Sequence, residues 1–145
     1  MVKDFNIRLM GLDYGNVHVG VALSDKLGMT AYPLEVIKRK DSNKLRKTFA
    51  RIEEIAREYK VDKIIIGLPL NMDDSESEIS KTVIDFSENI KRRTGLPVEL
   101  WDERLSTLEA TDILKEAGIK VQDRKTYIDK IAASFILRRY MEDNA

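Results

Sequence analysis

The 145-residue sequence contains no cysteine, which excludes disulfide bonds, thiolate metal sites and cysteine nucleophiles. It has no apolar stretch near the roughly 20 residues that a membrane-spanning helix needs, and residues 1–7 lack the apolar run of a signal peptide. It also lacks internal repeats and any linker rich in proline or glycine. These absences predict a cytoplasmic protein without a membrane partner, folded as one domain over residues 1–145.

Net charge is also absent, because 25 lysine and arginine residues balance 25 aspartate and glutamate residues. A chain without net charge has no bulk attraction to nucleic acid or to an anionic membrane. Hydrophobic residues make up 43% of the sequence and charged residues 34%, a balance that favours a globular fold over disorder.

Hydrophobic patterning predicts strands over residues 7–13, 17–23, 32–37, 63–67 and 97–101. The short turn at Gly15 and Asn16 predicts an antiparallel hairpin between the first two strands. Residues 63–67 are almost wholly apolar, as is typical of a central strand that is covered on both faces.

Apolar residues at helical spacing predict helices over residues 44–60 and 125–141. Ser75 with Glu78 forms a capping box that predicts the start of a third helix. The apolar stripe of that helix comprises Ile79, Val83, Phe86 and Ile90. Ser106 with Glu109 opens another predicted helix, which ends near Gly118. The element order predicts an α/β fold: a mixed five-stranded sheet of three antiparallel strands and two parallel strands, with helices on both faces.

Asp13 is the first candidate for chemistry, because it ends the first predicted strand. An acid there points out of the carboxyl edge of the sheet, where ligands of α/β sheets usually bind. The alternative is that Asp13 only starts a turn before Gly15.

Two adjacent acids, Asp102 and Glu103, follow the last predicted strand. Successive strand residues face opposite sides, so at most one of the two points into a site, and alternation alone does not choose between them. Arg104 comes next and either clamps a phosphate group or pairs with Asp102 on the surface.

Asp129 interrupts an apolar run on the last predicted helix. Ala132 and Ala133 lie over its own face and either let that face approach the sheet closely or leave room for a ligand. A carboxylate near an apolar face is unfavourable unless it is paired or bound to a metal ion. The alternative is a rim acid bridged to Lys125 or Lys130.

If Asp13, Glu103 and Asp129 converge, they form a site of oxygen ligands without histidine or cysteine, which suits Mg²⁺ or Mn²⁺. Paired divalent ions in such sites support phosphodiester hydrolysis. The single histidine, His18, cannot form a serine–histidine–aspartate triad alongside this site and is interpreted as a residue on the face of the sheet.

Four segments, in this order along the chain, resemble one known family: residues 11–25, 66–73, 102–107 and 129–133. The sequence is similar to the YqgF family, also called RuvX, of bacterial ribonuclease-H-like proteins. The resemblance implies the ribonuclease H fold and a metal-dependent nuclease that processes the 5′ end of pre-16S rRNA. The same family has also been described as Holliday junction resolvases.

By position, the resemblance implies that Asp13, Glu103 and Asp129 are the metal-binding and catalytic acids, and it selects Glu103 over Asp102. The sequence departs from the family at His18, where a basic residue is common, and at Asp74 and Ser77, which replace usual glycines. These departures concern contacts with the substrate. The expected partners are precursor rRNA or branched DNA and ribosomal particles, with the chain acting as a monomer or a homodimer.

The distribution of charge shows how a neutral chain could hold a polyanion. Residues 38–51 contain seven basic residues and one acid, and further basic clusters lie at residues 91–93, 124–125 and 138–139. Each phosphate that they neutralise would contribute to binding through counterion release. The alternative is a solvated helix face that Glu53, Glu54 and Glu58 balance.

Two other functions remain open from the sequence. A non-catalytic nucleic-acid-binding module could keep the same fold and the same acids. A phosphotransferase of the sugar-kinase type resembles the segment around Asp13, Gly15 and Gly20, but such enzymes place the nucleotide between two lobes and this chain has the length of one.

Overall fold

The computed structural model describes residues 7–15, 17–25, 28, 30–41, 44–69, 78–102, 115–118 and 120–144, with the backbone alone over 121–130. The strands are β1 (Leu9–Tyr14), β2 (His18–Ser24), β3 (Ala31–Lys38), β4 (Lys63–Leu68) and β5 (Val98–Asp102), and the helices are α1 (Arg46–Glu58), α2 (Glu78–Thr94) and α4 (Val121–Asp143). All five predicted strands are therefore confirmed, each within two residues of its expected bounds.

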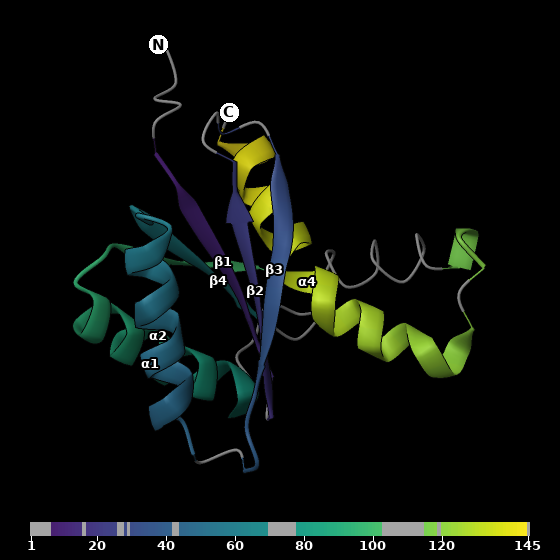
Figure 1. Ribbon diagram of the computed structural model, residues 1–145, viewed down its shortest axis with the longest axis horizontal. Coiled ribbons are helices and arrows are strands. Elements are labelled where there is room, and N and C mark those ends of the chain that lie inside the picture. The colour runs from purple at the N-terminus through teal and green to yellow at the C-terminus, as the bar shows by residue number, and fades with distance from the viewer. Residues whose placement is uncertain are drawn as a thin grey trace.

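The strands form one mixed sheet in the order β3-β2-β1-β4-β5 (Figure 1). β2 runs antiparallel to both β1 and β3, whereas β1, β4 and β5 run parallel to one another. The carboxyl ends of β1, β3, β4 and β5 consequently meet at one edge, which is called the carboxyl edge below. This arrangement confirms the predicted sheet.

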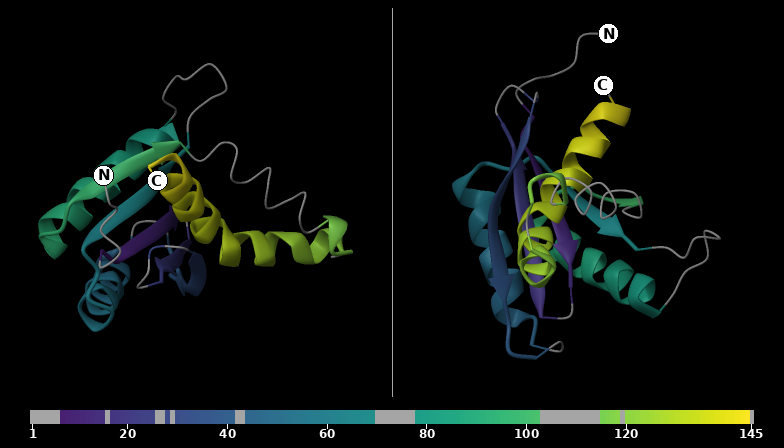
Figure 2. Two further views of the ribbon diagram at one scale, coloured as in Figure 1. Left: turned by 90° about the horizontal axis from the view of Figure 1, so that it is seen from above. Right: turned by 90° about the vertical axis from the view of Figure 1, so that its right-hand side faces the viewer.

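Helices cover both faces of the sheet, as predicted (Figure 2). On one face, α1 and α2 pack on the strands through a core cluster that includes Leu12, Ile52 and Phe86. On the other face, a second cluster joins α4 to the strands through residues such as Ile65 and Leu137. Alternate residues of each strand thus serve two separate cores. None of the helices in the described ranges has both the length and the apolar character that a bilayer crossing requires.

Three of the four predicted helices are confirmed as α1, α2 and α4, the last beginning four residues earlier than predicted, while most of the helix predicted from Ser106 lies outside the described residues. Val83, Phe86 and Ile90 of α2 are buried, but Ile79 is 37% exposed, so the predicted stripe begins one turn too early. Ile79 lies in the first turn of α2. In α1, Ile55 is fully buried, although the apolar spacing that predicts this helix does not include it. That spacing comprises Leu45, Phe49, Ile52, Ala56 and Tyr59.

Two residues with positive φ end the helices on the first face. The chain leaves α1 through Lys60 at φ 54° and leaves α2 through Gly95 at φ 72°. The left-handed conformation stops a helix and is easiest for glycine, which explains why α2 ends immediately before Gly95.

Candidate active site

Asp13 lies in β1 one residue before its end, where it pairs with Gly20 of β2. It is therefore part of the strand ladder and does not follow the strand. Met10 and Leu12 pack in the core beneath α1 and α2, whereas Leu9 packs against the α4 cluster. Because strand residues alternate between faces, the half-buried Asp13 belongs to the face that α4 covers.

Small residues flank Asp13 on both neighbouring strands. Gly20 is its partner on β2. On β4, Ile66 pairs with Leu12, so Gly67 comes level with Asp13 in the parallel ladder. Neither glycine contributes a side chain beside the carboxylate, so neither strand blocks access to it from the α4 face.

The path of α4 brings its sequence past Asp13. Near the carboxyl end of α4, the Tyr140 hydroxyl accepts a hydrogen bond of 2.8 Å from Lys63 Nζ at the start of β4. Farther back, the Ala133 carbonyl oxygen would lie only 2.9 Å from a Cβ placed on Gly11. Thus α4 runs antiparallel to β1 and crosses it closely, as the small residues of the helix predicted.

Asp129 precedes Ala133 by four residues, or about one helical turn, on the same side of the helix. Since α4 runs antiparallel to β1, this turn lies toward the carboxyl end of β1, where Asp13 is located. The carboxyl-terminal part of α4 lies on the sheet, whereas its amino-terminal part turns away from it (Figures 1 and 2), so the approach of Asp129 to Asp13 stays a prediction. The side chain of Asp129 lies outside the described part of the structure.

β5 shows on which face of the sheet Asp102, the first of the two adjacent acids, lies. Trp101 faces α4, since its ring contacts that of Tyr140 edge-on at 5.2 Å between centroids. The next residue, Asp102, ends β5 on the opposite face. The strand thus directs Asp102 away from the face that carries Asp13.

Several predicted residues lie outside the described ranges. They are Asp74, Ser75, Ser77, Glu103, Arg104, Ser106 and Glu109. The meeting of Asp13, Glu103 and Asp129 therefore stays a prediction. Among the side chains that are described, no three histidine, cysteine, aspartate or glutamate residues lie close enough together to hold a metal ion.

Arg39 is a residue that the sequence did not single out. Its Nη2 donates a 2.7 Å hydrogen bond to the Gly15 carbonyl, and its guanidinium lies 5.1 Å from the centre of the Tyr14 ring. Its backbone N–H also donates to the Val17 carbonyl at 2.8 Å. Arg39 thereby holds the β1–β2 turn, two residues from Asp13. Its only signal in the sequence is membership of a basic run.

Lys38 and His18 lie at the same edge. They pair directly across β2 and β3, and both fall on the α4 face because Val19 and Ile37 beside them belong to the opposite core. A lysine therefore lies beside the position where the sequence departs from its family. His18 is half-buried on the sheet face, as its interpretation predicted.

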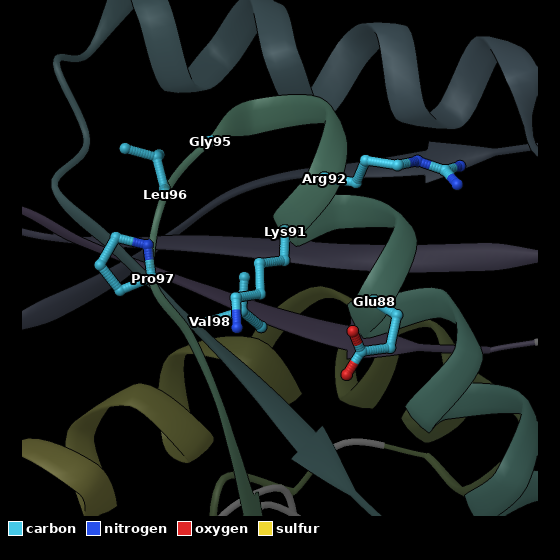
Figure 3. A pocket seen from close by; sticks show the side chains of 7 residues that line it. All are labelled: Glu88, Lys91, Arg92, Gly95, Leu96, Pro97 and Val98. Carbon is cyan, nitrogen blue, oxygen red and sulfur yellow. The ribbon is translucent and has the colours of Figure 1, made fainter.

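The described hollows lie far from Asp13. One hollow of 710 Å³ is lined by Glu88, Lys91, Arg92, Gly95, Leu96, Pro97 and Val98 (Figure 3). It occupies the turn from α2 into β5, at the amino end of the parallel strands. A smaller hollow of 320 Å³ lies beside it between the ends of α1 and α2. Neither contains a predicted site residue.

Comparison with known proteins decides the family. The family model described as "RuvX: Holliday junction resolvase" matches residues 7–143. The chain belongs to the RuvX family.

Curated relatives of this RuvX member match it over nearly their whole length. A protein of Lachnospira eligens is 57% identical over 136 residues, which cover 94% of this chain and 97% of the relative. A protein of Agathobacter rectalis is 48% identical over 136 residues, which cover 94% and 95%. Both are named "Putative pre-16S rRNA nuclease".

Solved structures identify the fold of the RuvX chain independently of close sequence similarity. Thermus thermophilus RuvC, in complex with a Holliday junction substrate, matches with a TM-score of 0.58 at 15% identity, covering 95% of each chain. The fowlpox virus Holliday junction resolvase matches with a TM-score of 0.57 at 18% identity, covering 96% of this chain and all of the other. The expected ribonuclease H-like fold is thus confirmed.

Proposed function

We propose that this RuvX family chain is a nuclease that hydrolyses phosphodiester bonds of precursor 16S rRNA at its 5′ end. The names of the relatives indicate the substrate, and the geometry at Asp13 supports the chemistry. The single observation that carries the proposal is the antiparallel crossing of α4 over Gly11. We infer from that crossing that the turn that contains Asp129 approaches Asp13, on a face where glycines leave the carboxylate accessible.

Glu103 completes the proposed set of acids. Trp101 faces α4 and Asp102 does not, so one further residue of extended chain would return position 103 to the α4 face. The same alternation argues against Asp102 as the third acid. Asp13, Glu103 and Asp129 are therefore the proposed catalytic residues.

The three acids fit a divalent cation by the chemistry of their donors. Carboxylate oxygens without histidine or cysteine suit Mg²⁺ or Mn²⁺, and like charges brought close together are stabilised by such an ion. When bound, the cation would activate water and stabilise the leaving oxygen. The chain itself would hold the cation through Asp13, Glu103 and Asp129 and contact a phosphate through Arg104, while Arg39 keeps the β1–β2 turn in position.

A Holliday junction resolvase is the second candidate, which the description of the matching family favours. Branched DNA would then be the substrate, and a homodimer would cut two strands symmetrically. We rank RNA processing first because both curated relatives carry that name. In that function the chain would act in the cytoplasm, as a monomer or a homodimer, on RNA within ribosomal particles.

One experiment tests the proposal against its alternatives. The purified chain is incubated with a 5′-extended 16S precursor, duplex DNA and a four-way DNA junction, in Mg²⁺, Mn²⁺ or EDTA. We expect cleavage of the precursor RNA that requires the metal, and a loss of roughly 100-fold or more in Asp13→Asn. Asp85→Asn, an exposed acid on α2, is the matched control and keeps full activity.

Each other outcome contradicts a defined part of the proposal. Cleavage in EDTA, or full activity of Asp13→Asn, would exclude the carboxylate site. Cleavage confined to the junction would favour the resolvase. Binding of RNA without cleavage in either metal would favour a non-catalytic module.

A further inference from the structure

A group of exposed basic side chains lies where β3 ends and α1 begins. We call this group the basic edge, and it comprises Lys38, Lys40, Arg46 and Lys47. Within the ranges that the structure describes, none of the four has a carboxylate within ion-pair distance, whereas Lys44 between them pairs with Asp41 at 3.4 Å. The basic edge is therefore a surface of uncompensated positive charge on a chain whose net charge is zero.

The basic edge adjoins the carboxyl edge that carries Asp13. Asp13 pairs with Gly20, and Gly20 pairs with Val36 on β3. Lys38 lies two residues beyond Val36 along β3 and on the same face of the sheet as Asp13. The two strands β1 and β3 are separated by two strand spacings, or about 10 Å. Figure 1 shows the end of β3 and the start of α1 at the end of the sheet where β1 also ends.

Helix stability does not explain this charge. The amino end of a helix carries partial positive charge, so cations there are unfavourable and acids are favourable. The first turn of α1 nevertheless contains Arg46 and Lys47, no acid, and no side-chain cap at Leu45. At the other end of the molecule, Lys91 and Arg92 lie in the last turn of α2, where cations stabilise a helix. Arg46 and Lys47 thus oppose the helix that carries them, which indicates a ligand.

We infer that the basic edge binds the phosphate backbone of the RNA strand that enters the site at Asp13. This inference rests on the proposed function, because a site that acts on a phosphodiester needs the flanking phosphates held at the same edge. The side chains of the four cations make the contacts, and no role is assigned to the backbone N–H groups of α1. Contacts of lysine and arginine with phosphates are independent of sequence and fix the position of the strand.

The test compares two pairs of substitutions that remove the same charge from opposite ends of the molecule. Arg46→Ala/Lys47→Ala changes the basic edge, and Lys91→Ala/Arg92→Ala changes the hollow of Figure 3. Binding of a fluorescent single-stranded RNA is measured by anisotropy in EDTA at several salt concentrations, so that cleavage does not interfere. Unlabelled RNA and poly-L-glutamate serve as competitors.

We expect Arg46→Ala/Lys47→Ala to reduce affinity at 0.1 M salt by about tenfold or more, and to lower the slope of log K against log salt by about 1.4. Lys91→Ala/Arg92→Ala should bind as the wild type does. Because cations oppose the amino end of α1, and alanine favours a helix, the Arg46→Ala/Lys47→Ala variant should melt no lower than the wild type. A loss of folding is thereby separated from a loss of binding.

Three results would overturn the inference: equal losses in both variants, no loss in either, or competition by poly-L-glutamate as strong as that by RNA. The inference and the proposed function fail separately. RNA binding that depends on Arg46 and Lys47, without any cleavage, would support RNA binding by the basic edge and contradict the proposed nuclease function. If Arg46→Ala/Lys47→Ala cleaves RNA with unchanged KM and unchanged RNA affinity, the nuclease function is supported and RNA binding by the basic edge is contradicted.

Discussion

Gly11 lies where β1 and α4 approach each other closely. A Cβ at this position would lie 2.9 Å from the Ala133 carbonyl oxygen and 3.0 Å from Leu137 Cβ, both closer than normal packing permits. The backbone oxygen cannot move without moving the helix. Gly11 therefore sets how near α4, and with it Asp129, comes to the strand that carries Asp13.

We expect Gly11→Ala to lower the free energy of unfolding by about 1–3 kcal/mol, because the added methyl group pushes α4 from the sheet. The same change should weaken binding of Mn²⁺, measured by calorimetry beside urea denaturation. Gly95→Ala is the control, since its positive φ disfavours alanine by about 1 kcal/mol but no atom lies within 4 Å of the new Cβ. Gly95→Ala should lose stability and keep metal affinity.

An increase in the free energy of unfolding of Gly11→Ala would contradict the steric conflict with α4. In a position without steric conflict, Gly→Ala stabilises a protein by about 0.4–1 kcal/mol, because alanine restricts the unfolded chain. A Gly11→Ala variant more stable than the wild type would show that α4 does not press on β1.

At the scale of single residues, the sequence indicated which residues are candidates for the site better than it indicated which face of the sheet each side chain occupies. Asp13 and the small residues before α4 were recognised because their types are unusual at strand ends and on apolar helix faces. The direction of Asp102 could not be predicted, because it depends on the contact of Trp101 with Tyr140, which joins residues far apart in the sequence. Arg39 could not be separated from its basic neighbours, because its role depends on the β1–β2 turn that it bonds.

Among the elements, α4 is fixed near its carboxyl end by a polar contact as well as by its core. Lys63 Nζ donates to the Tyr140 hydroxyl at 2.8 Å and lies 3.8 Å from Glu99 Oε2. The hydrogen bond with Tyr140, supported by Glu99, raises the pKa of Lys63 above its ordinary 10.5 despite partial burial. This contact joins the end of α4 to the start of β4.

The raised pKa of Lys63 gives a prediction for alkaline pH. A folded-state pKa above the unfolded value means that the stabilisation is complete below pH 10.5 and is lost as pH rises through the folded pKa. The difference in unfolding free energy between the wild type and Lys63→Met should therefore be constant below about pH 10 and shrink above it. Urea titrations over this range measure it, with the exposed Lys81→Met as the control. If the difference in unfolding free energy between the wild type and Lys63→Met grew with pH, the raised pKa of Lys63 would be contradicted.

At the scale of elements, hydrophobic periodicity predicted which segments are helices and which are strands. It did not predict the residues at which their buried faces begin and end. The stripe of α2 was extended to Ile79 because spacing alone carries no information on where the sheet stops. Ile55 of α1 was missed because it lies at the border of the stripe, yet it belongs to the buried cluster that joins α1, α2 and the strands. Such boundaries depend on neighbouring layers, which a local pattern does not contain.

For the whole molecule, the proposed site joins distant parts of the chain: β1, the segment after β5, and α4. A cation that binds only the folded chain stabilises it by about 2.7 kcal/mol at a concentration 100 times its dissociation constant. We expect Mn²⁺ to raise the melting temperature of the wild type and to leave that of Asp13→Asn unchanged. Scanning calorimetry with and without Mn²⁺ measures both, and an equal rise in the two proteins would place the cation elsewhere.

The crossing of α4 over Gly11 also has a consequence for biosynthesis. The strand that carries Asp13 is synthesised well before α4, the helix that covers its face of the sheet. Until residue 133 and its neighbours are free to pack, the described cover of that face is not in place. A nascent chain in which α4 has not yet packed would therefore lack a complete form of the proposed site.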